Sequence, residues 1–229
     1  MKKTLTLLLL TSSISLTYAQ AQNTLTTNGM LPTDMNVFNQ VSSKNSNRAL
    51  KYDEIKGSPY INSSFILAKF RDNFENAPAR YNTYKDEVEY TKDGETYILP
   101  KTDDFTRITF TKNTDILVML DTKDELSGYF YELINGKYSL YKKIKTKFTD
   151  SQPAKNSYDT ETPAIFKTLD PIYYIKTDRG FIKKPKNQKE IIEQIPDKKD
   201  ALIIFFKENK IKFDKEEDLK KLVTFLNQN

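Results

Sequence analysis

The sequence contains no cysteine, no histidine and no tryptophan among its 229 residues. Without cysteine there is no disulfide, no thiol nucleophile and no cysteine to carry a lipid at a new N-terminus. Without histidine the commonest general base is missing, together with every Ser-His-Asp triad and the usual zinc sites. Any catalysis would therefore depend on Asp, Glu, Lys, Tyr, Ser or Arg side chains.

Glycine and ordered acidic motifs are also scarce. Six glycines leave no glycine-rich loop that would hold a phosphate group. The acidic clusters Asp103-Asp104 and Asp121 to Glu125 lack the alternating ligands and the central glycine of a calcium loop, and carboxylates in such turns usually bind backbone N–H groups. We therefore predict no cofactor, no metal ion and no catalytic residue.

The N-terminus has the pattern of a secretory signal peptide, which we place at residues 1–21. Two lysines precede an apolar run, residues 5–10, and small residues follow at Ala19 and Ala21. Cleavage after either alanine satisfies the rule, and the apolar run is shorter than the roughly 20 residues of a membrane-spanning helix. We predict an exported protein, either periplasmic, outer-membrane-associated or extracellular, with no transmembrane segment after cleavage.

The charge of the chain limits the class of partner. The formal net charge is +5, and loss of Lys2 and Lys3 with the signal peptide, which takes no acidic residue, leaves +5 − 2 = +3. Nucleic-acid binders show a clustered, strongly basic face, which 36 basic and 31 acidic residues do not indicate here. We predict no nucleic-acid partner, and favour an envelope protein or an anionic glycan or lipid surface.

Hydropathy and turn signals divide the rest of the chain into three parts. Residues 22–56 are rich in Asn, Ser and Thr, and we predict a flexible polar leader because such a segment buries too little apolar area to offset its ordering entropy. Residues 57–184 alternate short apolar runs with tight turns, which predicts an antiparallel β domain. Residues 185–229 change to helical period and predict a helical subdomain packed on that domain. The predicted fold class is α+β: an antiparallel β-meander, as a sheet or an open barrel, followed by three short helices.

Two hairpins can be predicted together with their register. Asp93-Gly94 and Asn135-Gly136 both tolerate the positive φ angles of a type I′ turn, which closes a two-residue loop. In each hairpin this register separates an apolar face from a polar one, and a slip of one residue would lose that separation. The predicted pairs are Tyr90 with Tyr97, Val88 with Leu99, Leu133 with Tyr138, and Tyr131 with Leu140.

Two further hairpins have longer loops. One joins residues 105–111 to residues 116–120, and the other joins residues 171–177 to residues 181–184. The continuous apolar run 116–120 predicts a strand buried on both faces.

The last part of the chain predicts three short helices. Asn187 caps the first, and Pro196 ends it. Asp197 caps a second helix through Asn209, whose apolar run, residues 203–206, we expect to be buried under the sheet. The third begins after Asp214, and its apolar stripe consists of Leu219, Leu222, Val223 and Leu226.

The strand after Asn135-Gly136 carries the most distinctive charge pattern. Period-2 alternation places four lysines on one face, and such a row could meet an anionic polymer or lipid phosphate. The more ordinary interpretation is a solvated sheet face, or an edge that resists strand pairing. Both interpretations stay open, and the candidate polyanion-binding residues are Lys137, Lys143, Lys145 and Lys147.

Several short segments between Gly57 and Asn227 are distinctive as a set: Gly57–Tyr60, Arg80–Glu87, Gly128–Phe130, Leu140–Lys143, Tyr173–Lys176 and Glu217–Leu222. Together they resemble a group of secreted, β-rich proteins of Bacteroidota-type bacteria. The resemblance implies an envelope-associated protein, and it assigns no activity, cofactor or catalytic residue.

Two functions from different classes remain. The first is an exported, non-enzymatic binding or assembly component in the periplasm or at the outer membrane. The alternative is a carbohydrate-active hydrolase, which needs two carboxylates about 5 to 10 Å apart across a cleft. A cleft with two acidic side chains, one with its pKa raised by burial, would favour the hydrolase.

Overall fold

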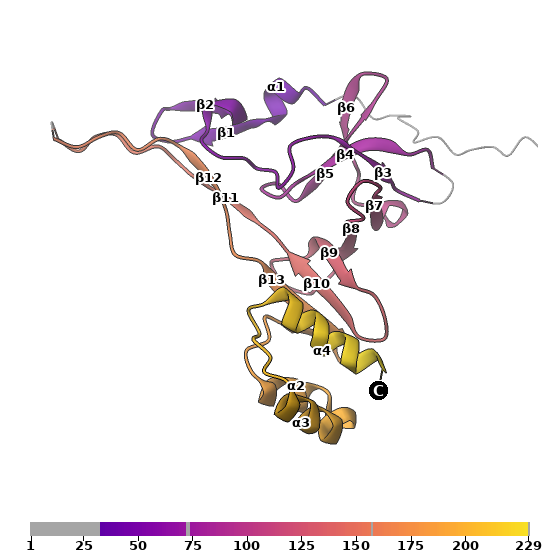
Figure 1. The fold of residues 1–229 in the computed structure, drawn as a ribbon. Coiled ribbons are helices and arrows are strands. Elements are labelled where there is room, and N and C mark those ends of the chain that lie inside the picture. The colour runs from indigo at the N-terminus through magenta and orange to yellow at the C-terminus, as the bar shows by residue number, and fades with distance from the viewer. Residues whose placement is uncertain (1–32, 72–73, 157, 229) are drawn as a thin grey trace, which may run out of the picture.

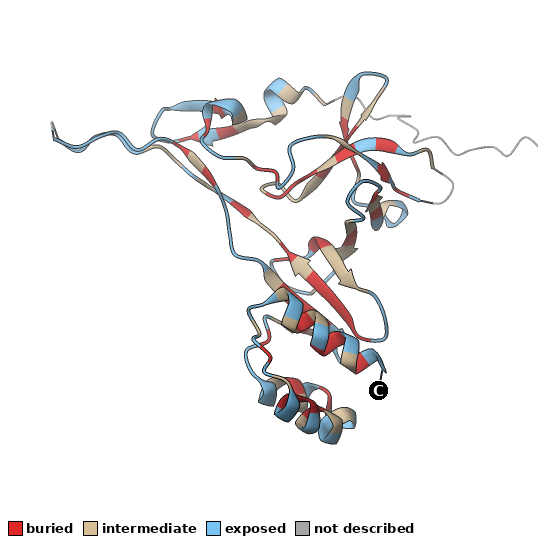
Figure 2. Ribbon diagram, viewed as in Figure 1, coloured by how far each residue is buried: buried red, intermediate tan, exposed pale blue. Residues whose placement is uncertain are grey.

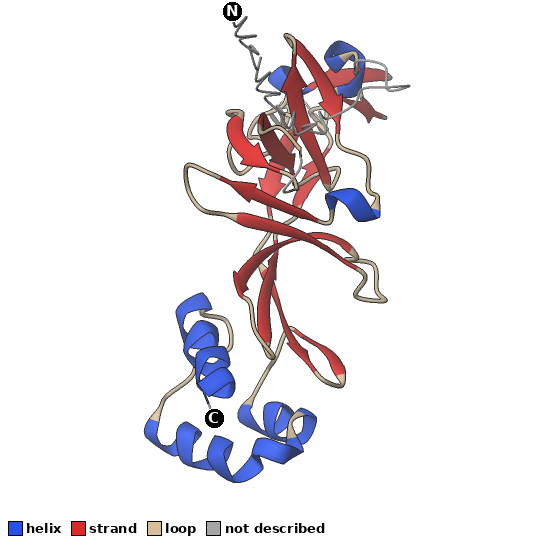
Figure 3. Cartoon of the chain, turned by 90° about the vertical axis from the view of Figure 1, so that its right-hand side faces the viewer, coloured by secondary structure: helices blue, strands red, loops and turns tan. Residues whose placement is uncertain are grey.

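The structure, a computed structural model, describes residues 33–71, 74–156 and 158–228. The predicted signal peptide, and the predicted leader up to residue 32, lie outside the described residues. The described chain is elongated, with the strands along its length and the three C-terminal helices at the end that carries the C-terminus (Figures 1 and 3).

An open, ten-stranded antiparallel sheet forms the body of the molecule. Its strands are β3 (Ile66–Lys69), β4 (Ala77–Asn82), β5 (Glu87–Lys92), β6 (Glu95–Ile98), β7 (Arg107–Phe110), β8 (Ile116–Leu120), β9 (Gly128–Ile134), β10 (Ser139–Lys143), β13 (Ile172–Thr177) and β14 (Gly180–Lys183). The spatial order is β14-β13-β10-β9-β8-β7-β3-β4-β5-β6. The predicted α+β class with an antiparallel meander is confirmed, although β3 lies between β7 and β4, and β13 pairs with β10 across a long excursion of the chain.

That excursion is a two-stranded ribbon, β11 (Thr146–Thr149) paired with β12 (Ile165–Thr168). Beside the ribbon lies an N-terminal unit consisting of α1 (Met35–Phe38), the hairpin β1 (Gln40–Ser43) and β2 (Arg48–Lys51), and the short 3₁₀ helix Tyr52–Glu54 (Figure 1). Val41 and Leu50 are buried against Phe166 of the ribbon. The prediction of a flexible leader is therefore wrong for residues 33–56, because their few apolar side chains find a partner surface far along the chain.

The Asp93-Gly94 hairpin has the predicted register. Tyr90 pairs with Tyr97, and their rings stack with centroids 5.4 Å apart. The N–H of Leu99 donates to the carbonyl of Val88 at 2.8 Å. The two longer hairpins, β7 with β8 and β13 with β14, are also confirmed.

The register predicted at Asn135-Gly136 is wrong. Ile134 pairs with Leu140 and Tyr131 pairs with Lys142, so the loop is longer than two residues and a bulge follows Leu140. Tyr138 does not pair with Leu133 because its backbone groups are hydrogen-bonded to the side chain of Asn227. The Tyr138 N–H donates to Asn227 Oδ1 at 2.9 Å, and Asn227 Nδ2 donates to the Tyr138 carbonyl at 2.8 Å.

The three predicted helices are α2 (Gln188–Gln194), α3 (Lys199–Glu208) and α4 (Glu216–Gln228). Asn187 caps α2 as predicted, because its side chain accepts the N–H of Glu190 at 3.0 Å. The predicted cap of α3 is wrong: Asp197 lies inside a 3₁₀ turn, Pro196–Lys198, and the residue that precedes α3 makes no side-chain cap bond. Another short 3₁₀ helix, Asp103–Phe105, precedes β7.

Buried side chains form a core on each face of the sheet and a third under the helices. Figure 2 shows where the buried residues lie along the ribbon. β8 contributes to two of them, since Leu117 faces an aromatic core with Tyr81 and Tyr129, whereas Val118 faces Phe130 on the other side. This confirms a strand buried on both faces. The predicted apolar stripe of α4 is also fully buried, with Leu219, Leu222, Val223 and Leu226 at most 1% exposed.

Candidate docking groove

The predicted row of lysines does not exist as an exposed face. Lys143 is buried, with 2% of its side chain exposed, and β10 ends at this residue. Lys145 follows in the connection to the ribbon, and Lys147 belongs to β11. Lys137 is exposed, but its ammonium lies 3.2 Å from a carboxylate oxygen of Asp178. The four lysines are therefore spread over separate elements, which is a correction of the predicted polyanion-binding face.

Lys143 belongs to a buried polar network. Its ammonium donates to Asp86 Oδ1 at 2.6 Å and to the carbonyl of Tyr129 at 2.8 Å, and it lies 4.8 Å from the centre of the Phe130 ring. The hydroxyl of Tyr81 donates to the same carboxylate oxygen at 2.5 Å. Burial lowers the pKa of Lys143, and the charge of Asp86 opposes that shift. The network fixes strands to one another and has no free group to offer to a ligand.

A second buried network surrounds the carboxylate of Glu89, which is inaccessible to solvent. Arg80 donates to it through Nε at 2.7 Å, and the Tyr60 hydroxyl donates at 2.9 Å. The guanidinium of Arg80 lies between the rings of Tyr60 and Phe65, 4.1 and 4.3 Å from their centres. Burial, and then the charge of Glu89, raise the pKa of Tyr60. This network too is internally satisfied.

The hydrolase alternative requires a hollow with two carboxylates, one of them buried. A hollow of about 560 Å³ is bordered by Asp103 and Asp104, but both are exposed and Asp104 pairs with Arg71. A much narrower hollow of about 30 Å³ contains Asp115, whose pKa is raised by burial, and no second acid lines it. Neither hollow has the pair of carboxylates that glycoside hydrolysis needs.

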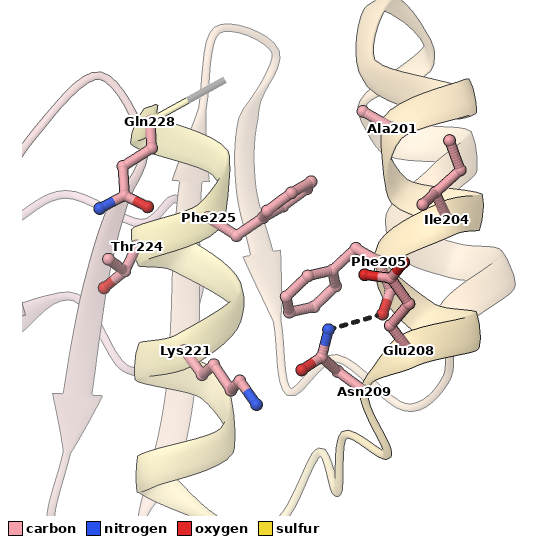
Figure 4. Close-up of a pocket in the computed structure, with 9 residues that line it drawn as sticks. All are labelled: Ala201, Ile204, Phe205, Glu208, Asn209, Lys221, Thr224, Phe225 and Gln228. Carbon is pink, nitrogen blue, oxygen red and sulfur yellow. Dashed lines mark hydrogen bonds between the residues drawn. The ribbon is translucent and has the colours of Figure 1, made fainter.

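A third hollow is a groove between α3 and α4, with a volume of about 560 Å³ (Figure 4). Its floor is aromatic, because the rings of Phe205 on α3 and Phe225 on α4 stack with centroids 4.3 Å apart and an angle of 22° between their planes. Ile204 stands on the α3 wall with 58% of its surface exposed. We call this hollow the α3–α4 groove, and its walls also include Ala201, Lys221 and Thr224.

Charged side chains stand at one end of the groove. Glu208 lies on the α3 side and Lys221 on the α4 side (Figure 4). Among the ion pairs found within residues 33–71, 74–156 and 158–228, none involves either side chain. The groove therefore combines an apolar floor with a charged rim, which is the composition of a protein-binding surface.

The groove is held on a rigid support. α4 is fixed to the sheet by the two hydrogen bonds of Asn227 with the Tyr138 backbone. At its other end Glu216 accepts from Lys142 of β10 at 2.8 Å. Burial alone would raise the pKa of Glu216, but hydrogen bonds from Lys142 and Lys220 outweigh it and lower that pKa, so the charged pair is kept. The aromatic floor is thereby positioned relative to the sheet.

Comparison with known proteins assigns no relative: no family model, curated protein or solved structure matches the chain. Within the part of the chain that the structure describes, acidic side chains form no group suited to a metal ion. No helix among the described residues has the length and apolar character to cross a membrane. The α3–α4 groove is accordingly the candidate site on geometry alone.

Proposed function

We propose that the protein is an exported, non-enzymatic assembly component of the cell envelope, and that it contacts another protein surface through the α3–α4 groove. The observation that carries the proposal is the exposed Ile204 beside the stacked rings of Phe205 and Phe225. The pattern of a signal peptide at residues 1–21 supports export.

The energetics favour a protein partner at this groove. Transfer of an isoleucine side chain from water into an apolar contact is worth about 1.5–3 kcal/mol. Ile204 lies next to an aromatic floor, so a partner that covers it also covers apolar area of Phe225. Residues of this kind at the centre of a contact usually supply most of the binding energy, while charged residues at the rim supply specificity.

The buried polar networks support a non-enzymatic role. The charged groups of Asp86, Lys143 and Glu89 are engaged by protein atoms within the sheet. A catalytic pair would instead place such groups beside an open hollow, within reach of a substrate. The apolar groove is open but contains no pair of neighbouring carboxylates, which suits contact better than chemistry.

Site-specific photo-crosslinking in the native host tests this function. A photoreactive amino acid replaces Ile204, and the envelope fraction is then probed for adducts of higher mass. We expect an adduct at this position and none when the same amino acid replaces Ile61, which is 50% exposed on another part of the molecule. Recovery of the chain in the cytoplasm only, with an uncleaved N-terminus, would contradict export, and an absence of adducts from Ile204 would contradict the groove.

A further inference from the structure

The sequence of α3 is self-complementary in charge when it is read backwards. The helix begins with Lys199-Asp200 and ends with Lys207-Glu208. If two such helices lie antiparallel about a point between Ile203 and Ile204, Asp200 of each copy meets Lys207 of the other on the face that carries Ile204. A parallel arrangement would place each charge opposite its own copy, which is unfavourable.

These side chains are available for such a contact. All four charged residues at the ends of α3 are exposed, as is Ile204. Asp200, Ile204 and Lys207 lie four and three residues apart, so they share one face of the helix. None of the four charged residues takes part in an ion pair found among the described residues. The face thus consists of an apolar centre with an unpaired acid on one side and an unpaired base on the other.

We propose that the protein surface bound at the α3–α4 groove is a second copy of this chain, related by a two-fold axis, with the two α3 helices antiparallel. This inference rests on the proposed function and names its partner. In a contact with two-fold symmetry, the same surface patch of each copy faces that of the other, and each contact between two different residues occurs twice. Ile204 of each copy covers the mouth of the groove on the other, beside Phe225.

The apolar and charged parts of this contact have different roles. Exposed ion pairs contribute little to affinity, and their main effect is to select orientation and register. The apolar contact of Ile204 therefore supplies the attraction, and the two ion pairs between Asp200 and Lys207 favour the antiparallel arrangement. Two short helices bury less area than a standard interface, so we expect association only at roughly micromolar concentrations or above.

Charge reversal tests the proposal in the purified, full-length protein. Sedimentation equilibrium over a range of concentrations gives the association constant for wild type, Asp200→Lys, Lys207→Asp and the double variant. Each single reversal creates two repulsive contacts, and we expect it to lower the association constant at least about tenfold. The double variant restores opposite charges and should return to within about threefold of wild type. If the single substitutions weakened association by disrupting the helix, the double variant would associate even more weakly. If they act through charge repulsion, the double variant removes that repulsion and association returns.

A second pair of variants tests the apolar centre. Ile204→Asp should abolish dimer formation, and Ile61→Asp, at a similarly exposed isoleucine, should leave it unchanged. A wild-type protein that stays monomeric at all concentrations, or a double reversal that does not restore association, would overturn the second-copy inference. In that case an adduct from Ile204 with a different protein would leave the proposed function intact. Conversely, dimerisation through α3 of a chain found only in the cytoplasm would overturn the proposed function alone.

Discussion

At the scale of single residues, the buried pair of Lys143 and Asp86 links strands that are distant in sequence. The carboxylate of Asp86 also accepts the N–H of Tyr129 and lies 3.0 Å from the ammonium of Lys101. A charge in this position is stable only while its partner is present, because removing one partner leaves the other buried and uncompensated. Each residue of the pair is therefore a sensitive position for stability.

Asp86→Asn should lower the free energy of unfolding by about 3–5 kcal/mol, because the Lys143 ammonium then has no buried counter-charge. Urea unfolding followed by circular dichroism measures the change. Asp121→Asn removes an exposed carboxylate that also pairs with a lysine, Lys123, and it should leave the free energy of unfolding nearly unchanged. Equal unfolding midpoints for the two variants would show that the buried pair contributes no more than a surface pair.

Gly128→Ala provides an independent test of the same region. Gly128 has φ +138°, and a Cβ atom there would lie 1.9 Å from Asp86 Oδ2. Gly94 also has a positive φ, +82°, but a Cβ atom at that position would meet nothing within 4 Å. Gly94→Ala should therefore cost only backbone strain of about 1–3 kcal/mol, and Gly128→Ala should cost more. Equal losses in urea unfolding would mean that the close approach to Asp86 relaxes without cost.

At the scale of elements, turn dipeptides in the sequence predicted the register of a hairpin correctly where only contacts within that hairpin determine it. The Asp93-Gly94 hairpin forms as its dipeptide indicates. The Asn135-Gly136 hairpin differs because Asn227, 89 residues after Tyr138, takes both backbone groups of that residue. A pattern read within one hairpin contains no information on such a contact.

The groove was missed for a related reason. The apolar run 203–206 covers nearly every side of a helix, because successive residues are about 100° apart. Phe205 and Phe206 are buried as expected, but Ile204 is exposed. Only the position of α4 decides which of these side chains faces solvent, so the sequence predicted a buried helix and could not predict the groove.

Removal of α4 should destabilise the whole fold. A chain that ends after Lys212 loses the four buried side chains of α4 and uncovers Leu140 on β10. Truncation of one buried leucine to alanine typically costs about 2–5 kcal/mol, against a total stability of about 5–15 kcal/mol for a folded domain. The melting temperature should fall sharply, and Leu222→Ala in the full chain should give an intermediate fall. An unchanged melting temperature would show that the helices are a detachable tail.

At the scale of the whole molecule, contacts between distant segments complete the fold. The Ser43 hydroxyl donates to Asp150 Oδ1 at 2.7 Å across 107 residues, which holds the N-terminal hairpin on the ribbon. Gly57 has φ +90°, and its Cα lies so close to the ribbon that a Cβ atom would be 2.3 Å from the Phe166 carbonyl oxygen. The sequence predicted a leader here because its apolar residues are few, and the surface that covers them is formed more than 100 residues later.

Buried tyrosines should make the fold unstable in alkali. Burial raises the pKa of Tyr52 and of Tyr173 from 10.0 to about 12, and it also raises the pKa of Tyr129, Tyr131 and Tyr174. A pKa raised in the folded state gives stability that is complete below pH 10 and is lost as the pH rises towards 12, because the unfolded chain releases its protons first. Burial lowers the pKa of Lys143 and of Lys85, and below pH 10.5 this acts in the opposite direction, but these are two groups against several.

The urea midpoint should therefore show no fall from about pH 8 to pH 10 and should fall steeply above pH 10. Tyr173→Phe removes one of the hydroxyl groups whose pKa is raised, so the urea midpoint of this variant should fall less steeply with pH than that of wild type. Tyrosinate absorbance, recorded in the same samples, should appear together with unfolding. A midpoint that stays constant up to about pH 12 would mean that the buried hydroxyls ionise without cost to the fold.

The ribbon has one further consequence, which concerns proteases. Beyond β11 and β12 the two arms of the ribbon extend away from the sheet (Figure 1), and a bridge between Gln152 and Thr162 joins them. Lys155 and Tyr158 follow in the connection between these two bridged residues and are exposed, Tyr158 to 99%. Exposed loop tips are preferred sites of cleavage, so trypsin should cut first after Lys155. The two fragments should still migrate as one particle on a sizing column, because β10 of the first fragment pairs with β13 of the second along five residue pairs. Co-expression of the two halves, divided at this tip, should then rebuild the protein from separate chains.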